Sequence, residues 1–110
     1  MVKIEGLKKS GQFAEVYKHS KSSATRFVVM YHKPNGLTVN RVGFSVSKKV
    51  GKSVVRNRAK RLIREAYRLN SDRVPVGYDL VFIARVRIVE ATYQDIEKSV
   101  RRLLKELRQK

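Results

Sequence analysis

The stretch RVGFSVSKKVGKSVVRNRAKRLIREAYR, residues 41–68, decides the fold because its hydrophobic pattern changes period part-way along. Residues 41–47 alternate as a half-buried strand does. One side carries Val42, Phe44 and Val46, and the other carries Gly43, Ser45 and Ser47. From about residue 54 to 69 the apolar residues recur with helical spacing instead. A strand that leads into a long amphipathic helix predicts a sheet with helices packed on it.

Two further helices are expected, one on each side of this stretch. Ser10 is a good N-cap for a short helix over residues 10–19. Thr92 opens the last helix, and Asp95 three residues later makes a variant of the capping box. The apolar stripe of this last helix consists of Tyr93, Ile96, Val100, Leu103, Leu104 and Leu107.

Three further strands complete the predicted sheet. Residues 21–25 read as a short edge strand, and residues 27–32 as a strong strand rich in β-branched and aromatic side chains. Residues 78–85 are apolar on both faces, as in a central strand. The predicted order is α-β-β-β-α-β-α. We therefore expect one α/β (α+β) sandwich domain over residues 1–110, with three helices on a single four-stranded, mostly antiparallel sheet.

The charge of the chain indicates its class of partner. It has 26 Lys and Arg against 9 Asp and Glu, for a net charge of +17 in 110 residues. A compact body with this charge repels itself, and nucleic acid is the default polyanion that offsets the repulsion. An anionic membrane is the weaker alternative, since the apolar helix faces are needed for the core. No run approaches a membrane span, and the chain has no cysteine, which fits a cytoplasmic protein.

The helix near residues 54–69 divides its charged and apolar residues between two sides. At about 100° per residue, one broad sector holds Arg56, Asn57, Lys60, Arg61, Arg64 and Arg68. The opposite side holds Val55, Ala59, Leu62, Ala66 and Leu69, with Arg58 at its margin. Like charges at i, i+4 destabilise a helix. A helix used only for packing would include glutamates, as the last helix does with Glu97 and Glu106. The pattern favours a phosphate-binding surface over a solvated basic face.

Three nucleic-acid or nucleotide sites could use such a helix. Gly51-Lys52-Ser53 resembles the end of a phosphate-binding loop, but that loop requires glycine at position 46, which is Val46. A DNA-binding helix-turn-helix needs a helix before the recognition helix, whereas residues 41–47 predict a strand. Recognition of folded RNA through its backbone and shape fits better.

A groove for single-stranded nucleic acid is also indicated. Phe13 and Tyr17 lie one helical turn apart, and Tyr31 lies on the neighbouring strand. Bases stack on such rings, and the small residues on the 41–47 strand leave room for a backbone. The alternative is that Phe13 and Tyr17 only anchor the first helix to the sheet.

The titratable residues do not predict a catalytic centre. The nine acids are dispersed, whereas metal-assisted hydrolysis uses clustered carboxylates. His19 and His32 lack paired ligand spacing, so each is interpreted as a surface histidine, with His19 near the groove edge. Asp79 is interpreted as structural. We predict neither catalytic nor metal-binding residues on this chain.

The stretch 41–68 resembles the signature of the bacterial ribonuclease P protein family, including its arginine-rich RNR helix. The flanking sequences LKKSGQFAEVYKHS and YDLVFIAR agree, so the resemblance covers nearly the whole chain. It implies a left-handed crossover between the strands at 41–47 and 78–85, although such crossovers are usually right-handed. Tyr17 stands where phenylalanine is common in the family, and a long basic tail is missing.

The resemblance also implies a function. In this family an RNA subunit carries out hydrolysis with Mg²⁺, while the protein binds that RNA and the 5′ leader of precursor tRNA. The residues implied to bind the RNA subunit are Lys48, Lys49, Lys52, Arg56, Asn57, Arg58, Lys60, Arg61, Arg64 and Arg68. Those implied to line the leader cleft are Phe13, Tyr17, His19, Tyr31, Ser45 and Ser47. Mg²⁺ is expected mainly on the RNA, and we expect neither a membrane nor an obligate protein partner. The alternatives are a structural ribosomal or other RNA-binding protein and an autonomous nuclease.

Overall fold

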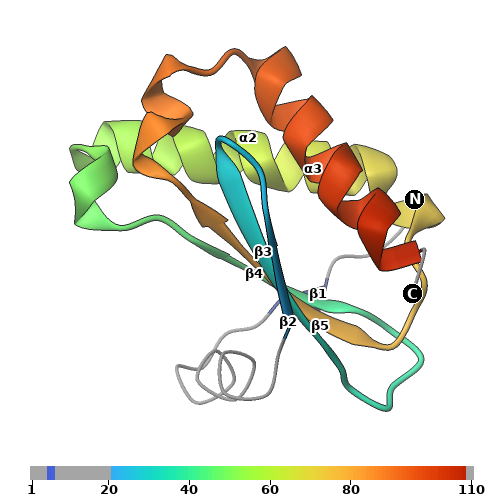
Figure 1. The fold of residues 1–110 in the computed structure, drawn as a ribbon. Helices are drawn as coiled ribbons and strands as arrows, with labels where there is room; N and C mark the ends of the chain where they lie inside the picture. Colours follow the sequence, from blue (N-terminus) through green and yellow to red (C-terminus); the bar gives the residue numbers. More distant parts are fainter. Residues whose placement is uncertain (1–4, 7–20, 109–110) are drawn as a thin grey trace.

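A computed structural model describes residues 5–6 and 21–108 of the chain (Figure 1). The strands are β1 (Glu5–Gly6), β2 (Lys21–Ala24), β3 (Val28–Pro34), β4 (Arg41–Ser45) and β5 (Tyr78–Ala84). The helices are α2 (Ser53–Asn70) and α3 (Tyr93–Arg108), with short 3-10 turns η1 (Lys48–Val50), η2 (Ser71–Arg73) and η3 (Val86–Glu90). The helix predicted over residues 10–19 lies outside the described residues.

The strands form one sheet in the order β1-β4-β5-β3-β2. β3 pairs antiparallel with both β5 and β2, whereas β4 pairs parallel with both β5 and β1. The sheet is therefore mixed, where the sequence pattern indicated mostly antiparallel pairing. The two-residue strand β1 was not predicted, because two residues carry no periodic pattern. β5 is central and almost wholly buried, as expected from its two apolar faces.

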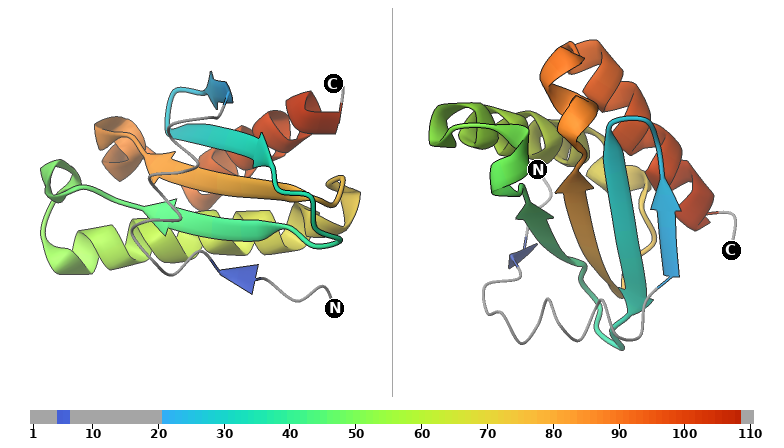
Figure 2. Two further views of the ribbon diagram at one scale, coloured as in Figure 1. Left: turned by 90° about the horizontal axis from the view of Figure 1, so that it is seen from below. Right: turned by 60° about the vertical axis from the view of Figure 1, so that its left-hand side comes forward.

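Both helices cover the same face of the sheet (Figures 1 and 2). α2 connects the parallel neighbours β4 and β5, and α3 crosses α2 in the same layer. The β4-α2-β5 connection is left-handed, as the left view of Figure 2 shows with the sheet in front of α2. The opposite face carries neither of these helices.

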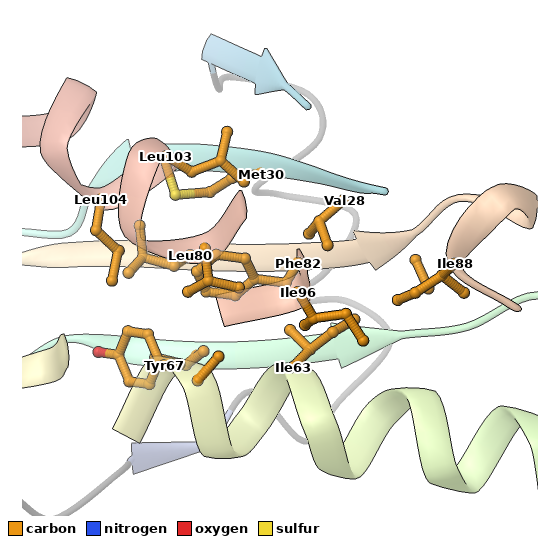
Figure 3. Packing of buried hydrophobic residues seen from close by; sticks show 14 of the residues in the cluster. Val28, Met30, Ile63, Tyr67, Leu80, Phe82, Ile88, Ile96, Leu103 and Leu104 are labelled. Carbon is orange, nitrogen blue, oxygen red and sulfur yellow. The ribbon is translucent and has the colours of Figure 1, made fainter. Parts of the chain in front are cut away.

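The core lies between the sheet and the two helices (Figure 3). Phe82 of β5 is fully buried; its ring stacks on Phe44 of β4 at 5.9 Å and lies 5.7 Å from the ring of Tyr67 of α2. Met30 of β3 lies near Leu103 of α3 on the same side of the sheet. Aromatic contacts thus attach α2 to the sheet, while aliphatic contacts attach α3.

The buried side of α2 differs from the predicted one. Its buried residues are Ala59, Ile63, Ala66, Tyr67 and Asn70. Val55 is 38% exposed and Leu69 is 54% exposed, although both were expected to face the core. Apolar side chains occupy much of the circumference of this helix, so periodicity alone could not choose among them. The sheet selects the side with the large residues Ile63 and Tyr67, which fill the space above Phe82.

The beginning of α3 confirms the predicted capping box. The Thr92 backbone N–H donates to Asp95 Oδ2 at 3.0 Å, and the Asp95 N–H donates to Thr92 Oγ1 at 3.2 Å. The hydrogen bond that the Asp95 carboxylate accepts from the Thr92 backbone, reinforced by the Thr92 side chain, holds the pKa of Asp95 below its usual value. The predicted apolar stripe of α3 is buried as well, except that Tyr93 is only partly buried.

Asp79 is a buried structural anion, as predicted. Its carboxylate accepts two hydrogen bonds from Arg41, at 2.8 and 2.7 Å, and one from Asn35 Nδ2 at 3.0 Å. Burial alone would raise the pKa of Asp79, but these hydrogen bonds outweigh it and keep the pKa below its usual value. The ion pair joins β4 to β5 and both strands to the turn after β3.

Replacing Asp79 by asparagine is expected to lower the free energy of unfolding at pH 7 by about 2–3 kcal/mol. Breaking a buried ion pair costs about 3–5 kcal/mol, and the loss is smaller here because the Arg41 side chain is 32% exposed. Since folding lowers the pKa of Asp79, its stabilisation is complete above the usual carboxyl pKa of about 4 and is lost as the pH falls further. The difference between wild type and Asp79→Asn should therefore shrink in acid.

Urea denaturation at pH 7 and pH 3 measures this difference. Asp72→Asn, at an exposed position in η2, is the control and should change stability by less than about 0.5 kcal/mol. A loss at Asp79 that stays the same at both pH values would contradict the assignment of the stabilisation to the carboxylate.

Among the described helices, none is both long enough and apolar enough to pass through a bilayer.

Candidate nucleic-acid interface

The exposed side of α2 is cationic along about two turns. Lys60, Arg61 and Arg64 are exposed, and within residues 21–108 none of them is in an ion pair. Asn57 and Arg58 are exposed one turn earlier. Because α2 has 3.6 residues per turn, Lys60 and Arg64 follow each other along one side, with Arg61 beside them. We call Asn57, Arg58, Lys60, Arg61 and Arg64 the α2 surface.

Two predicted cations of α2 have intramolecular partners. Arg68 binds Glu65 through Nε at 3.1 Å and Nη2 at 2.5 Å, which raises the pKa of Arg68 and lowers that of Glu65. Arg56 is half-buried, and its Nε donates to the Gly51 carbonyl at 3.2 Å. Arg56 therefore connects α2 to the preceding loop, while Lys60, Arg61 and Arg64 keep their charges available to a partner.

The loop before α2 presents three exposed lysines: Lys48, Lys49 and Lys52. The loop is ordered by buried Val50 and by Ser47 Oγ, which accepts the Lys49 N–H at 3.3 Å. Gly51 follows with φ of 152°, and a Cβ there would lie 3.2 Å from Val55 Cβ. The first turn of α2 contains no acidic residue, so these lysines extend the positive charge at the start of the helix.

The face of the sheet opposite α2 and α3 holds the described part of the predicted leader cleft. Tyr31 of β3 pairs with Val81 of β5, which pairs with Gly43 of β4, so the three residues form a row across this face. Tyr31 and Ile83 pack against Val81 in a small cluster separate from the main core. Ser45 lies beside Ile83 in the next row, and Ser47 is exposed just beyond β4. Phe13, Tyr17 and His19 lie outside the described residues.

The interpretation of His32 as a surface histidine is wrong. Its side chain is 3% exposed and faces the helices, with its ring 6.3 Å from that of Tyr78 in an edge-on arrangement. Strand alternation places His32 on the same side as buried Met30, and β3 continues two residues further than predicted. His32 therefore belongs to the core and not to the cleft.

Comparison with known proteins identifies the chain. A family described as Ribonuclease P matches residues 1–108. The ribonuclease P protein component of Caldanaerobacter subterraneus subsp. tengcongensis is 53% identical over 94% of this chain and 89% of its own length. That of Clostridioides difficile is 54% identical over 94% of this chain and 91% of its own length. The solved RNase P protein of Staphylococcus aureus superposes with a TM-score of 0.86 at 35% identity, covering 94% of this chain and 95% of that one.

The chain belongs to the ribonuclease P protein family. It is a subunit of ribonuclease P, the endoribonuclease that matures the 5′ ends of tRNAs. Membership implies RNA-based catalysis and an RNA subunit as the partner. The sequence resemblance to this family is confirmed, and the alternative of a ribosomal protein is not supported.

The acidic and histidine side chains in the described part of this chain are not grouped as metal ligands. Within residues 5–6 and 21–108, no three His, Cys, Asp or Glu side chains are grouped so that they could hold a metal ion. The carboxylate of Asp79 is instead engaged by Arg41 and Asn35.

One basic surface of this ribonuclease P protein was missed in the sequence. The outward side of α3 carries Lys98, Arg101, Arg102, Lys105 and Arg108, all exposed. Their spacing of three and four residues was a readable signal. It was overlooked because Glu97 and Glu106 made α3 look charge-balanced.

Proposed function

We propose that this subunit binds the ribonuclease P RNA with the α2 surface and with the loop lysines Lys48, Lys49 and Lys52, and holds the 5′ leader of precursor tRNA against the face of the sheet opposite α2 and α3. The observation that carries this proposal is the placement of Lys60, Arg61 and Arg64 on the solvent side of a helix whose other side is the core. Arginine and lysine in such an array bind successive backbone phosphates.

The contact with the RNA subunit uses ten residues in three groups. Lys60, Arg61 and Arg64 are the central contacts, because they are exposed and lack an ion pair in the described part of the chain. Lys48, Lys49, Lys52, Asn57 and Arg58 extend the surface toward the start of α2, and Arg56 and Arg68 orient it through Gly51 and Glu65. The array of guanidinium groups suits bidentate recognition of phosphates.

The leader contact uses the face of the sheet opposite both helices. Tyr31 of β3 offers an aromatic ring, and the small residues Gly43 and Ser45 of β4, on the other side of β5, leave room for a nucleic-acid backbone. Ser47 continues this strip, and Phe13, Tyr17 and His19 are proposed to complete the cleft. The RNA subunit then contacts the helix layer and the leader contacts the opposite face of the sheet, so the protein can hold both at once.

The protein contributes to catalysis through binding and charge. With a net charge of +17, it offsets repulsion between two RNAs that must approach closely. We expect ribonuclease P to use Mg²⁺ and propose that the RNA subunit binds most of it. We also propose that the complex acts in the cytoplasm. We propose no obligate protein partner.

Cleavage of precursor tRNA by the RNA subunit at low Mg²⁺, with and without this chain, tests the proposal. Adding the protein should raise kcat/KM for precursor tRNA strongly at low Mg²⁺ and much less at high Mg²⁺, because Mg²⁺ then screens the same phosphates. Equal rates with and without the protein at low Mg²⁺ would refute the proposal.

Tyr31→Ala is expected to weaken binding of precursor tRNA by the holoenzyme roughly 5- to 100-fold, since one stacked base contributes about 1–3 kcal/mol. Tyr31→Phe keeps the ring and should stay within about twofold of wild type. Affinity for mature tRNA, which lacks the leader, and for the RNA subunit should not change. The measurement is the Kd of precursor and mature tRNA for each holoenzyme, and an equal loss for both tRNAs would exclude a leader contact.

A further inference from the structure

The outward side of α3 forms a cationic pocket that the proposed function does not use. The pocket has a volume of about 520 Å³ and lies against the end of α2. It is lined by Asn70, Lys98, Arg101, Arg102, Leu104, Lys105 and Arg108. Five of these seven residues are cations and none is acidic. We call the five cations the α3 surface.

The acidic residues of α3 do not neutralise this surface. Asp95 caps the helix through Thr92. Glu97 accepts a hydrogen bond from Asn70 Nδ2 at 3.0 Å and lies 3.6 Å from Arg101. Glu106 is half-buried and does not line the pocket.

Four of the five cations of the α3 surface have no ion pair within residues 21–108: Lys98, Arg102, Lys105 and Arg108. Lys98 and Arg102 lie four residues apart, as do Arg101 and Lys105, so like charges repeat along one side of the helix. Such pairs are destabilising in the free protein. A polyanionic partner would relieve this repulsion.

The length of the α3 surface favours a nucleic-acid backbone over a small anion. Residues 98 to 108 extend for about 15 Å along the helix at 1.5 Å per residue. One phosphate group cannot contact all five cations over that distance, whereas a run of backbone phosphates can.

The position of the α3 surface indicates which RNA it contacts. Asn70 is the last residue of α2 and also lines the pocket, so the α3 surface begins where α2 ends. α2 and α3 form one layer on the same face of the sheet, as both views in Figure 2 show. An RNA that covers the α2 surface can continue over this layer, whereas a leader held on the opposite face would have to pass around the sheet edge.

We propose that the α3 surface is a second binding site for the phosphate backbone of the ribonuclease P RNA subunit, separate from the α2 surface. This inference rests on the proposed function, because it takes the RNA bound at α2 as the occupant. The two sites would bind the same RNA at two separate places and so fix the orientation of the protein on it.

The test compares the variant Arg102→Gln/Lys105→Gln/Arg108→Gln with the control Lys21→Gln/Arg26→Gln/Arg87→Gln. Both remove three exposed charges from the intact chain, but the control residues lie on β2, next to β3 and in η3. Kd for the RNA subunit is measured between 50 and 300 mM salt, and Kd for a leader oligonucleotide is measured in parallel. Thermal unfolding confirms that each variant is folded.

The α3 variant should bind the RNA subunit on the order of 10- to 100-fold more weakly, and the slope of log K against log salt should become shallower by about 2–3, one unit per lost phosphate contact. The control should lose less than about threefold. An equal loss of RNA-subunit affinity in the two variants would show that net charge alone explains the effect, and it would overturn the proposal.

A loss confined to the leader oligonucleotide would assign the α3 surface to the substrate instead, which also overturns the proposal. Substitution of the α2 surface tests the proposed function separately. If that substitution has no effect on RNA-subunit binding while the α3 variant does, the proposed function fails and the α3 site stands.

Discussion

The variant Lys60→Gln/Arg61→Gln/Arg64→Gln should bind the ribonuclease P RNA subunit on the order of 100-fold more weakly than the wild type at physiological salt. Each lost phosphate contact removes about one released counterion, worth roughly 1 kcal/mol at this salt concentration. The three side chains are exposed, so their replacement leaves the core intact. The salt dependence should flatten by about 2–3 units of slope. Filter binding or titration across a salt series measures both quantities.

The control for this variant is again Lys21→Gln/Arg26→Gln/Arg87→Gln, which removes the same net charge at other places on the surface. Its Kd should rise only a few-fold, and its salt slope should stay close to that of the wild type. The role of the α2 surface would be refuted if the two triple variants gave the same affinity and the same slope.

Phe82→Ala is expected to cost about 3–5 kcal/mol of the free energy of unfolding, the range observed for buried Phe. Phe82 is fully buried at the centre of β5 and contacts both Phe44 and Tyr67. Its removal leaves a cavity between the sheet and α2. Because domains of this size are stable by only about 5–15 kcal/mol, the variant should lose a large part of its stability. The measurement is the urea midpoint and the m-value at pH 7.

Two further variants serve as controls for the loss of stability expected in Phe82→Ala. Phe82→Leu retains most of the volume and should cost less than about 1.5 kcal/mol. Val76→Ala, at a position that is 66% exposed, should change stability by less than about 0.5 kcal/mol. A cost for Phe82→Ala similar to that of Val76→Ala would show that the Phe82 contacts do not hold α2 on the sheet.

Local sequence patterns were sufficient where neighbouring residues decide the structure. The alternation of Val42 with Gly43 and Phe44 predicted β4 and its two faces, and the pair Thr92 and Asp95 predicted the start of α3. The apolar character of residues 78–85 predicted a central strand. Each of these features depends on residues within a few positions of one another, so the chain specifies them without knowledge of its partners in space.

Where a sequence pattern was compatible with several structures, tertiary contacts determined which one forms. α2 carries apolar residues around much of its circumference, and packing against Phe82 buried Ile63 and Tyr67 in place of Val55 and Leu69. His32 became a core residue because β3 extends to Pro34 and pairs with β5 along its whole length. The mixed strand directions depend on how the crossover through α2 closes, which spans too many residues for a local pattern to specify.

The two basic surfaces show the same division. Composition alone predicted a polyanionic partner, and the run of cations in α2 predicted the surface that would contact it. The free cations of α3 were hidden in the sequence by Glu97 and Glu106. Only the folded chain draws Glu97 toward Asn70 and Arg101, and leaves Arg102, Lys105 and Arg108 facing outward. Periodicity is a local property of the chain and could be read directly, whereas the contacts of Glu97 with Asn70 and of Asp79 with Arg41 join distant segments and required the tertiary structure.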